Sequence, residues 1–147
     1  MSLSVTKAVE ALVRSAAEAA FPEECCGFLL GPTPEDFEVL GRPVVVEAVR
    51  PLPNGWESGE RTRRYQIDPK LLAKVEEELS GSGRSIVGFY HSHPGVPAWP
   101  SPFDLLRAWP CYSYWIVSVM EGKTAGSRSW MRSEDGESFI EEAVEVA

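Results

Sequence analysis

Histidine and cysteine are scarce in this 147-residue chain, and so are basic residues and long apolar runs. There are two histidines and three cysteines, and no apolar run reaches about 18 residues, the least that suggests a membrane-spanning helix. Lysine and arginine number 14 against 22 acidic residues, which gives a net charge of −8. Without a basic stripe, neither nucleic acid nor an anionic membrane is an expected partner.

The cysteines do not suggest a disulfide framework. Cys25 and Cys26 are adjacent and therefore poorly placed to bridge each other, while Cys111 stands alone. Charged residues interrupt the N-terminal segment, which is unlike a secretory signal. Reduced thiols and the lack of a signal predict a cytoplasmic protein, and the length suits one domain. The oligomeric state is left open, with a homodimer as one possibility.

Both histidines fall in one short stretch, Gly88–Pro94. The overlapping segment Ser85–Tyr90 is β-branched and aromatic, which predicts a buried strand. Side chains two apart on a strand point to one face, so His91 and His93 present two imidazoles to the same point. Asp104 follows at the expected start of a short helix. Two imidazoles and one carboxylate are the protein ligands of a catalytic zinc site that keeps one position open.

Each part of this pattern also has a simpler structural interpretation. An isolated histidine is most often a surface residue or a satisfied core residue. Ser101 and Asp104 fit a capping box, with Pro102 at the first helical position. In that arrangement the carboxylate of Asp104 bonds the helix N-terminus, so we expect capping and metal binding to compete for it.

Taken together, His91-Ser-His-Pro94, Ser101 and Asp104 resemble the motif of the JAMM (MPN+) zinc metalloprotease family. Glu24, within Phe21–Gly31, matches the upstream glutamate of that motif. The resemblance extends over roughly residues 3 to 132 and is closest to the stand-alone bacterial branch. It implies an α/β fold in which helices flank a mixed, curved sheet, as in cytidine deaminases, with residues 1–147 as one domain.

The same resemblance implies a role for each site residue. One zinc ion per chain is held by His91, His93 and Asp104. Glu24 is the general base, and Ser101 donates a hydrogen bond to the oxyanion. The implied reaction is hydrolysis of the bond after the C-terminal Gly-Gly of a ubiquitin-like or sulfur-carrier β-grasp protein, the expected partner.

Two other functions stay open. The first is a non-catalytic interaction module with structural zinc, which needs a fourth protein ligand that only a cysteine can supply here. The second is a zinc deaminase, but the H-x-E and P-C-x-x-C motifs of that class are absent. The sequence favours the hydrolase over both.

Pro51–Arg64 is the least regular segment and is rich in turn residues. It contains Trp56, followed by Arg61, Arg63 and Arg64. This composition fits a solvated loop, but an aromatic residue beside clustered arginines is also typical of binding surfaces. In the JAMM family this region helps to hold the tail of the substrate, so these four residues are candidate substrate-binding residues.

The remaining periodicities predict the order of helices and strands. An N-terminal helix with a stripe that includes Val5 and Leu12 is capped by Ser4 or Thr6 and ends at Phe21-Pro22. Later helices are expected at 69–80, with Asp68 as the N-cap, and at Ser101–Ala108. Strands are expected at Cys25–Leu30, Phe37–Leu40, Val44–Val49, Tyr112–Met120 and Arg128–Arg132, with Trp130 in the core. The β-branched run Val44–Val49 predicts a central strand. Residues 133–147 fit either a strand or a helix.

Overall fold

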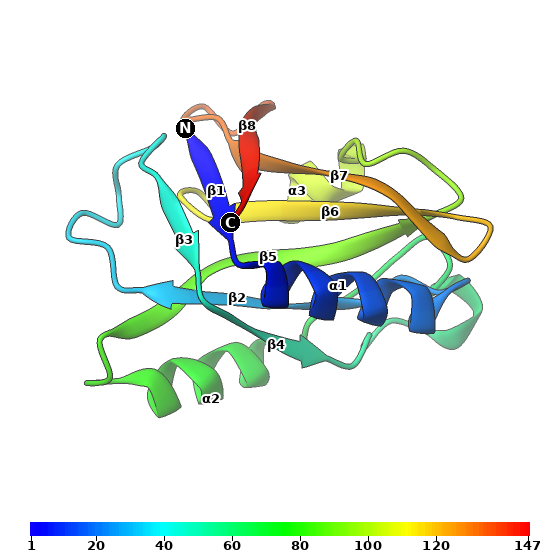
Figure 1. Cartoon of the computed structure of the whole chain (residues 1–147), viewed down its shortest axis with the longest axis horizontal. Coiled ribbons are helices and arrows are strands. Elements are labelled where there is room, and N and C mark those ends of the chain that lie inside the picture. Colours follow the sequence, from blue (N-terminus) through cyan, green and yellow to red (C-terminus); the bar gives the residue numbers. More distant parts are fainter.

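A computed structural model describes residues 1–147 as one curved, mixed sheet with three α-helices (Figure 1). The strands lie in the order β3-β1-β8-β7-β6-β5-β2-β4. Their bounds are β1 Ser2–Val5, β2 Cys26–Pro32, β3 Val44–Val46, β4 Ala48–Leu52, β5 Arg84–Pro94, β6 Ser113–Met120, β7 Lys123–Arg132 and β8 Phe139–Val146. The helices are α1 Lys7–Ala20, α2 Pro69–Leu79 and α3 Pro102–Arg107, with a 3-10 turn at Ser58–Glu60. None of these helices has the length and apolar character needed to cross a membrane.

Helix α1 covers one face of the sheet and completes the larger core. Thr6 caps it by accepting a hydrogen bond from the N–H of Val9 at 3.0 Å, as the sequence predicts. Its buried stripe is Val9, Val13 and Ala17, whereas Leu12 is exposed. The residues before the helix do not extend it: they form β1, which pairs in parallel with β3 and β8. Local periodicity misses β1 because its partners are distant in the sequence.

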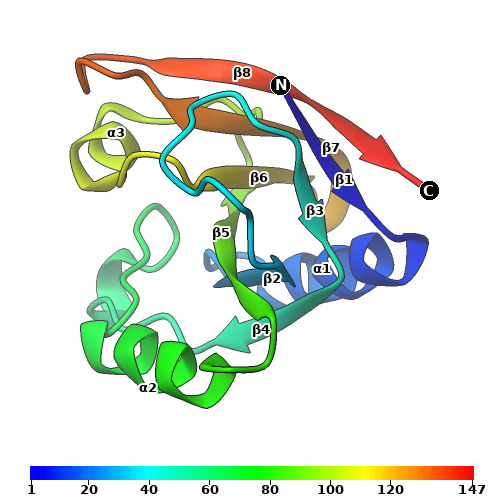
Figure 2. The same cartoon turned by 90° about the vertical axis from the view of Figure 1, so that its left-hand side faces the viewer.

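Helices α2 and α3 lie on the other side of the sheet from α1 (Figure 2). Helix α2 begins as predicted, with the carboxylate of Asp68 accepting from the N–H of Lys70 at 2.9 Å and proline at the first position. Val75 of this helix packs with Phe28 of β2 and Phe89 of β5 in a second, smaller core. This second core adjoins the site described below.

The prediction for Val44–Val49 is wrong in two respects. The run breaks at Glu47 into β3 and β4, and these strands occupy the two ends of the sheet order instead of its centre. The sheet curls so far that β3 approaches β2, and the N–H of Glu47 donates to the carbonyl of Leu30 at 2.8 Å. Gly31 permits this approach, since a Cβ there would lie 1.9 Å from the carbonyl oxygen of Val45. Val44 and Val46 are therefore buried by the curvature of the sheet and not by a central position, while Val45 between them is exposed.

The structure corrects the prediction for Phe37–Leu40 and decides between strand and helix for the C-terminal tail. Phe37–Leu40 forms turns and no strand, and the ring of Phe37 packs instead on Tyr112 at 5.1 Å between centroids. The undecided tail forms β8, which pairs antiparallel with β7 and parallel with β1. Trp130 is buried, as predicted. The tail thus joins the β1 and β3 end of the sheet to the strands that carry the site.

Candidate metal centre and catalytic site

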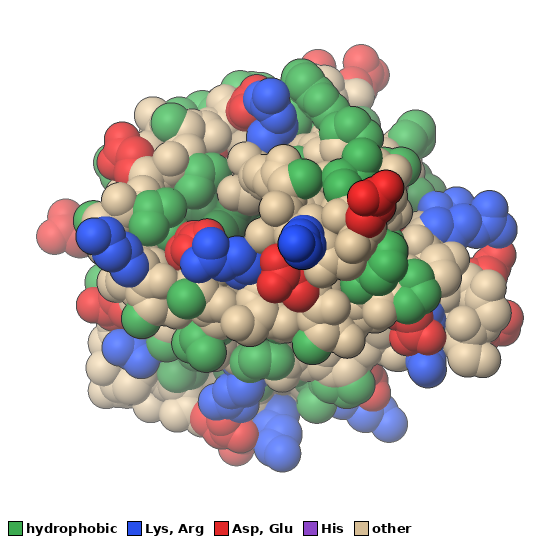
Figure 3. All heavy atoms as spheres, turned by 45° about the vertical axis from the view of Figure 1, so that its right-hand side comes forward, with side chains coloured by type: hydrophobic (Ala, Val, Ile, Leu, Met, Phe, Trp, Pro, Cys, Tyr) green, Lys and Arg blue, Asp and Glu red, His purple; other side chains and the backbone are tan.

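Strand β5 carries both histidines on the face that bears α2 and α3. It pairs antiparallel with β2 and parallel with β6, and a register shift against β2 has the form of a β-bulge. The bulge lets Ile86 and Phe89, three residues apart, face the same core. From Phe89 onward the alternation is regular, so His91 and His93 continue that face. Both are buried, and neither is visible on the face shown in Figure 3.

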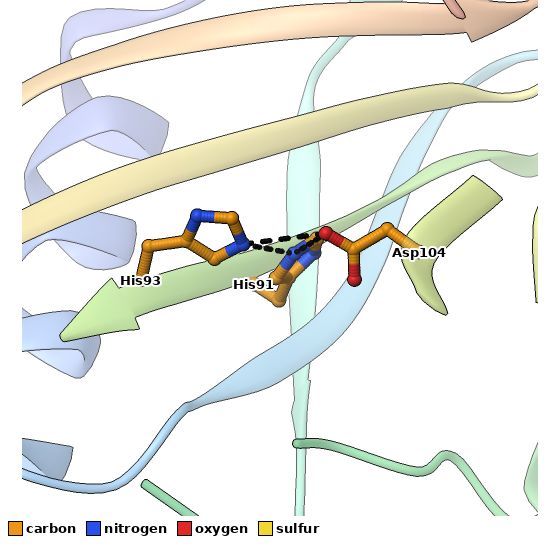
Figure 4. A group of neighbouring side chains, drawn as sticks. All are labelled: His91, His93 and Asp104. Carbon is orange, nitrogen blue, oxygen red and sulfur yellow. Dashed lines mark hydrogen bonds and ion pairs between the residues drawn. The ribbon is translucent and has the colours of Figure 1, made fainter. Parts of the chain in front are cut away.

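The side chains of His91, His93 and Asp104 converge on one point (Figure 4). The two histidine Nε2 atoms are 3.2 Å apart. Oδ2 of Asp104 lies 3.5 Å from Nε2 of His91 and 3.3 Å from Nε2 of His93. Asp104 comes from the first turn of α3, so a strand and a helix together form the cluster. The structure thus brings together the three residues that the sequence predicts to be metal ligands.

The spacing of these three atoms suits a zinc ion. Tetrahedral ligands about 2.0–2.1 Å from zinc lie about 3.3 Å from one another, close to the three separations. Nδ1 of His93 lies 3.0 Å from the carbonyl oxygen of Pro97. A proton on Nδ1 leaves the Nε2 lone pair facing the cluster, as a metal ligand requires. Electron-rich atoms this close in a buried space need a positive charge between them, so the donor set fits zinc.

Asp104 also completes the capping box of α3. Its Oδ2 accepts from the N–H of Ser101 at 2.8 Å, and Oγ of Ser101 accepts from the N–H of Asp104 at 3.0 Å. The expected competition is not found, because one oxygen both accepts the capping bond and faces the histidines. A carboxylate oxygen has two lone pairs, which permits both contacts. The capping bond therefore fixes the direction in which the carboxylate points.

Mutual interactions set the protonation of the cluster. Burial by itself raises the pKa of Asp104, but the charge of His91 and hydrogen bonds from both histidines hold that pKa well below its usual range. Burial by itself lowers the pKa of His93, but its bonds to Asp104 and to the Pro97 carbonyl outweigh burial and raise the pKa. Asp104 is therefore ionised at neutral pH, as a metal ligand must be.

Glu24 lies beside this cluster without belonging to it. Extending the pairing of Cys26 with His91 by two residues places Glu24 opposite His93, on the same face. Its side chain is buried and its carboxylate accepts no hydrogen bond from the protein. Burial raises the pKa of Glu24, although the charges of His91 and His93 oppose the shift. A buried carboxylate of this kind is suited to accept a proton.

Two serines near the cluster have different contacts. Oγ of Ser101 accepts the capping bond, so its hydroxyl proton stays free to donate elsewhere. Ser92 lies between the histidines in sequence but on the opposite face of β5. Its Oγ accepts from the N–H of Cys25 at 2.8 Å, and its own N–H donates to the carbonyl of Cys25 at 3.1 Å. Ser92 thus fixes the main chain next to Glu24 and faces away from the cluster.

Residues 54–66, here called the site loop, contain the predicted substrate-binding residues. The ring of Trp56 meets Phe103 edge to face, with 5.4 Å between centroids. The guanidinium of Arg64 lies 4.4 Å from the centroid of the same Phe103 ring. Since Phe103 precedes Asp104, the structure brings these two residues to the edge of the cluster.

Arg61 and Arg63 make contacts within the site loop itself. Nε of Arg61 donates to the carbonyl of Trp56 at 2.7 Å, and Arg63 forms an ion pair with Glu60 at 2.8 Å. Nε1 of Trp56 also donates to Glu60, at 2.9 Å. The three arginines therefore differ. Arg64 packs against α3, Arg61 shapes the site loop, and Arg63 is mostly exposed.

Tyr65 is a site residue that the sequence analysis missed. Its ring stacks on the imidazole of His91, with 4.4 Å between centroids and 23° between the planes. Nδ1 of His91 is buried without a hydrogen-bond partner, so the stacking contact supports the ring in addition to the contacts of Nε2. An aromatic residue directly after Arg64 was the only available signal, and nothing in the sequence pairs it with His91.

An apolar pocket of about 200 Å³ adjoins Asp104 between α2, α3 and the site loop. Aromatic side chains dominate its lining: Tyr65, Phe89, Phe103, Trp109 and Tyr114. Arg107 and Gln66 supply polar groups. Apart from Asp104, none of these residues is a predicted site residue, because the pocket forms only when two helices and a loop meet.

The fold and the proteins similar to this chain define a hydrolase of the JAMM type, built on a JAB1/MPN domain, and its three clustered donor atoms suit a metal ion. Residues 6–133 match the family of prokaryotic homologs of the JAB domain, and the chain belongs to this family. It is 35% identical over 126 residues to a desampylase of Haloferax volcanii, spanning 85% of this chain and 79% of that one. It is 38% identical over 92 residues to a probable TtuB-protein conjugate cleaving protease of Thermus thermophilus, spanning 63% of this chain and 57% of that one.

Solved structures agree with the expected fold. A protein from Desulfitobacterium hafniense is 29% identical with a TM-score of 0.79, over 99% of this chain and 92% of that one. A JAB1/MPN domain protein from Archaeoglobus fulgidus, at 18% identity, has a TM-score of 0.58 over 98% of both chains. The predicted α/β fold with a curved mixed sheet is confirmed.

Proposed function

We propose that this hydrolase cleaves the peptide or isopeptide bond after the C-terminal Gly-Gly of a ubiquitin-like or sulfur-carrier β-grasp protein. The observation that carries the proposal is the convergence of His91, His93 and Asp104, with the unpaired carboxylate of Glu24 beside them. The names of the similar proteins, a desampylase and a TtuB-conjugate cleaving protease, support the substrate class.

His91, His93 and Asp104 would hold one zinc ion per chain. When bound, zinc lowers the pKa of a coordinated water from about 15.7 to about 7. A catalytic site of this kind needs three protein ligands and one position left for water, and the cluster offers three. The buried setting of the cluster strengthens the attraction between cation and ligands.

Glu24 then transfers protons, and Ser101 stabilises the negative charge that develops on the carbonyl oxygen. The Glu24 carboxylate accepts a proton from the attacking water and returns it to the nitrogen of the leaving amine as the C–N bond breaks. The hydroxyl of Ser101 donates to the oxygen of the scissile carbonyl as negative charge develops there. A donor of this kind contributes about 3 to 4 kcal/mol to such reactions. The products are the carrier carboxylate and a free amine.

The substrate tail is proposed to approach along the site loop. Trp56 and Arg64 lie on Phe103 at the edge of the cluster, next to the aromatic pocket. Strand β4 is the last strand at this end of the sheet and pairs with β2 on one side, so its other edge carries no further strand. An extended tail ending in glycine suits such an edge, because main-chain hydrogen bonds hold it regardless of side chains.

A non-catalytic module with structural zinc is the alternative. A closed structural site has four protein ligands, and the cluster has three. Cys26, opposite His91 across the sheet, turns its thiol toward the carbonyls of Leu52 and Pro53, at 3.9 and 3.8 Å. Burial raises the pKa of this thiol to about 12, which disfavours a thiolate ligand. The alternative therefore lacks its fourth ligand.

Glu24→Gln tests the proposal. With a β-grasp carrier protein extended past Gly-Gly as substrate, kcat should fall about 10²- to 10⁴-fold while bound zinc stays near one per chain. Glu23→Gln, one residue away, is the matched control and should keep full activity. Loss of zinc in Glu24→Gln would make Glu24 a ligand, and unchanged kcat would refute the base. Mass analysis of the products identifies the bond cut.

A further inference from the structure

Asn54 makes four hydrogen bonds with its side chain, which is every bond that an amide of this kind can form with two donors and one carbonyl oxygen. Nδ2 donates to the carbonyls of Glu24 at 3.1 Å and Arg64 at 2.9 Å. Oδ1 accepts from the N–H groups of Trp56 at 3.0 Å and Gln66 at 3.2 Å. One side chain therefore ties both ends of the site loop together and ties the loop to Glu24.

The position of Asn54 follows from the sheet. In the antiparallel pairing of β2 with β4, Cys26 lies opposite Leu52. Extending this register by two residues would place Glu24 opposite Asn54. Strand β4 ends before that point, and Pro53 has no N–H to donate. The side chain of Asn54 supplies the missing donor to the Glu24 carbonyl. The N–H of Glu24 also donates to the site loop, with the carbonyl of Arg61 as the acceptor at 2.6 Å.

The loop that Asn54 closes touches the metal cluster as well. Tyr65 stacks on His91 at 4.4 Å between centroids, and Trp56 packs on Phe103, the neighbour of Asp104. These contacts depend on the loop path, which Asn54 sets at residues 56, 64 and 66. The carboxylate of Glu24 has no hydrogen bond of its own, so only its main chain and packing direct it.

We infer that Asn54 is a positioning residue that holds Glu24 in the place required for proton transfer, an inference that rests on the proposed role of Glu24 as base. All four side-chain bonds of Asn54 go to main-chain groups, and none goes to His91, His93 or Asp104. Asn54 acts through the main chain of Glu24 and through the closed site loop. A displacement of about 1 Å at a reacting group can cost about 10²-fold in rate, so loss of this anchor should be visible in kcat.

Asn54→Asp separates the two parts of this role. The variant keeps an acceptor for the N–H groups of Trp56 and Gln66, so these two loop bonds remain, but it loses both donors and so releases the carbonyls of Glu24 and Arg64. We expect kcat on the extended carrier protein to fall about 10- to 100-fold, with KM and zinc affinity changed less than about threefold. Asn54→Ala also opens the loop and should raise KM in addition. Ser133→Ala, which removes the bonds of Ser133 to Ser138 and Asp135 in a distant turn, is the control and should leave kcat unchanged.

A double-variant cycle decides whether Asn54 acts through Glu24. In the Glu24→Gln background, adding Asn54→Asp should lower the residual rate no further, because the group it positions is already lost. A further full loss in that background, or a parallel fall in zinc affinity and thermal stability, would make Asn54 a structural residue and overturn the inference. Wild-type kcat in Asn54→Asp alone would overturn it too. Full activity of Glu24→Gln would instead refute the proposed function, so the two failures are distinguishable.

Discussion

The two sides of the site are built in different ways. On one side, His91 and His93 lie in the middle of the sheet, on a strand paired along both edges. On the other side, Glu24 lies just before the start of β2. The site loop and the short helix α3 complete the site around it. Regular pairing fixes the two histidines, the capping bond from Ser101 directs Asp104, and single side chains, Asn54 and Tyr65, fix the loop side. Substitutions on the strand side should therefore have the larger effect on zinc binding. Substitutions on the loop side should mainly change turnover and contact with the substrate.

The largest effect should come from removing the strand side. The double variant His91→Ala/His93→Ala deletes two of three donor atoms, so zinc content should fall from near one per chain to near zero. Because the remaining carboxylate is a weak site alone, turnover should vanish as well. Metal analysis of the purified variants measures this, with Ser92→Ala, on the opposite face of β5, as the comparison. Unchanged stoichiometry in the double variant would contradict the ligand assignment.

A smaller effect on the metal should come from the loop side through Tyr65. Since no hydrogen bond to Nδ1 holds the His91 ring and Tyr65 stacks on it, Tyr65→Ala should weaken zinc binding about 10-fold, the low end of effects seen for groups that orient metal ligands. Tyr65→Phe keeps the stacked ring and should bind zinc like the wild type. Chelator competition measures both. Equal affinity in the alanine variant would mean that the sheet alone holds His91.

The next effect concerns encounter with the substrate. Arg61, Arg63 and Arg64 together were predicted to attract the carrier protein, but Arg61 and Arg64 also support the loop, so Arg63 is the clean test. Arg63 is mostly exposed and pairs only with Glu60. Arg63→Ala should lower kcat/KM for the carrier protein a few-fold at low salt, and the loss should shrink as ionic strength rises.

Arg14→Ala provides the matched control, because Arg14 is also exposed and paired with a nearby glutamate, but on α1. It should leave kcat/KM unchanged at every salt concentration. A salt-independent loss for Arg63→Ala, or equal losses for a short neutral peptide and the carrier, would show that the loop needs this side chain for its own structure.

The smallest effect is on stability. The pKa of Glu24 is raised by burial in the folded protein above its ordinary value of 4.5, so the folded state binds this proton more tightly than the unfolded state. As the pH rises from below 4.5 through the raised pKa, Glu24 ionises in its buried position, and the free energy of unfolding of the zinc-free protein falls. Glu24→Gln removes that loss and should have a slightly higher Tm at neutral pH than the chelated wild type. The difference should disappear at pH values below 4.5, and a lower Tm at neutral pH would contradict it.

Much of the regular structure was predictable from short-range signals. Thr6, Asp68 and Ser101 cap their helices as expected, because capping depends on residues within one turn. The face shared by His91 and His93 follows from the alternation of a strand. The errors lie where distant segments decide: β1 was assigned to a helix, and the run Val44–Val49 to the centre of the sheet.

The loop side of the site was predictable only in outline. Composition singled out Trp56 and the three arginines, but it gave no means of separating the residues that face the cluster from those that support the loop. Tyr65 and Asn54 carried no pattern at all, since an isolated tyrosine or asparagine in a turn has many ordinary uses. Their partners, His91 and Glu24, lie more than one element away along the chain.

The sequence by itself predicted the candidate site from two imidazoles at strand spacing and a carboxylate at a capped helix start, and the resemblance to the JAMM motif added Glu24. These patterns are local, because alternation and capping act over a few residues. The tertiary structure decided how the pieces meet. Only the curl of the sheet buries β3, and only the ends of β2 and β4 place Asn54 beside Glu24. Such contacts depend on the register between distant segments, which no local pattern encodes.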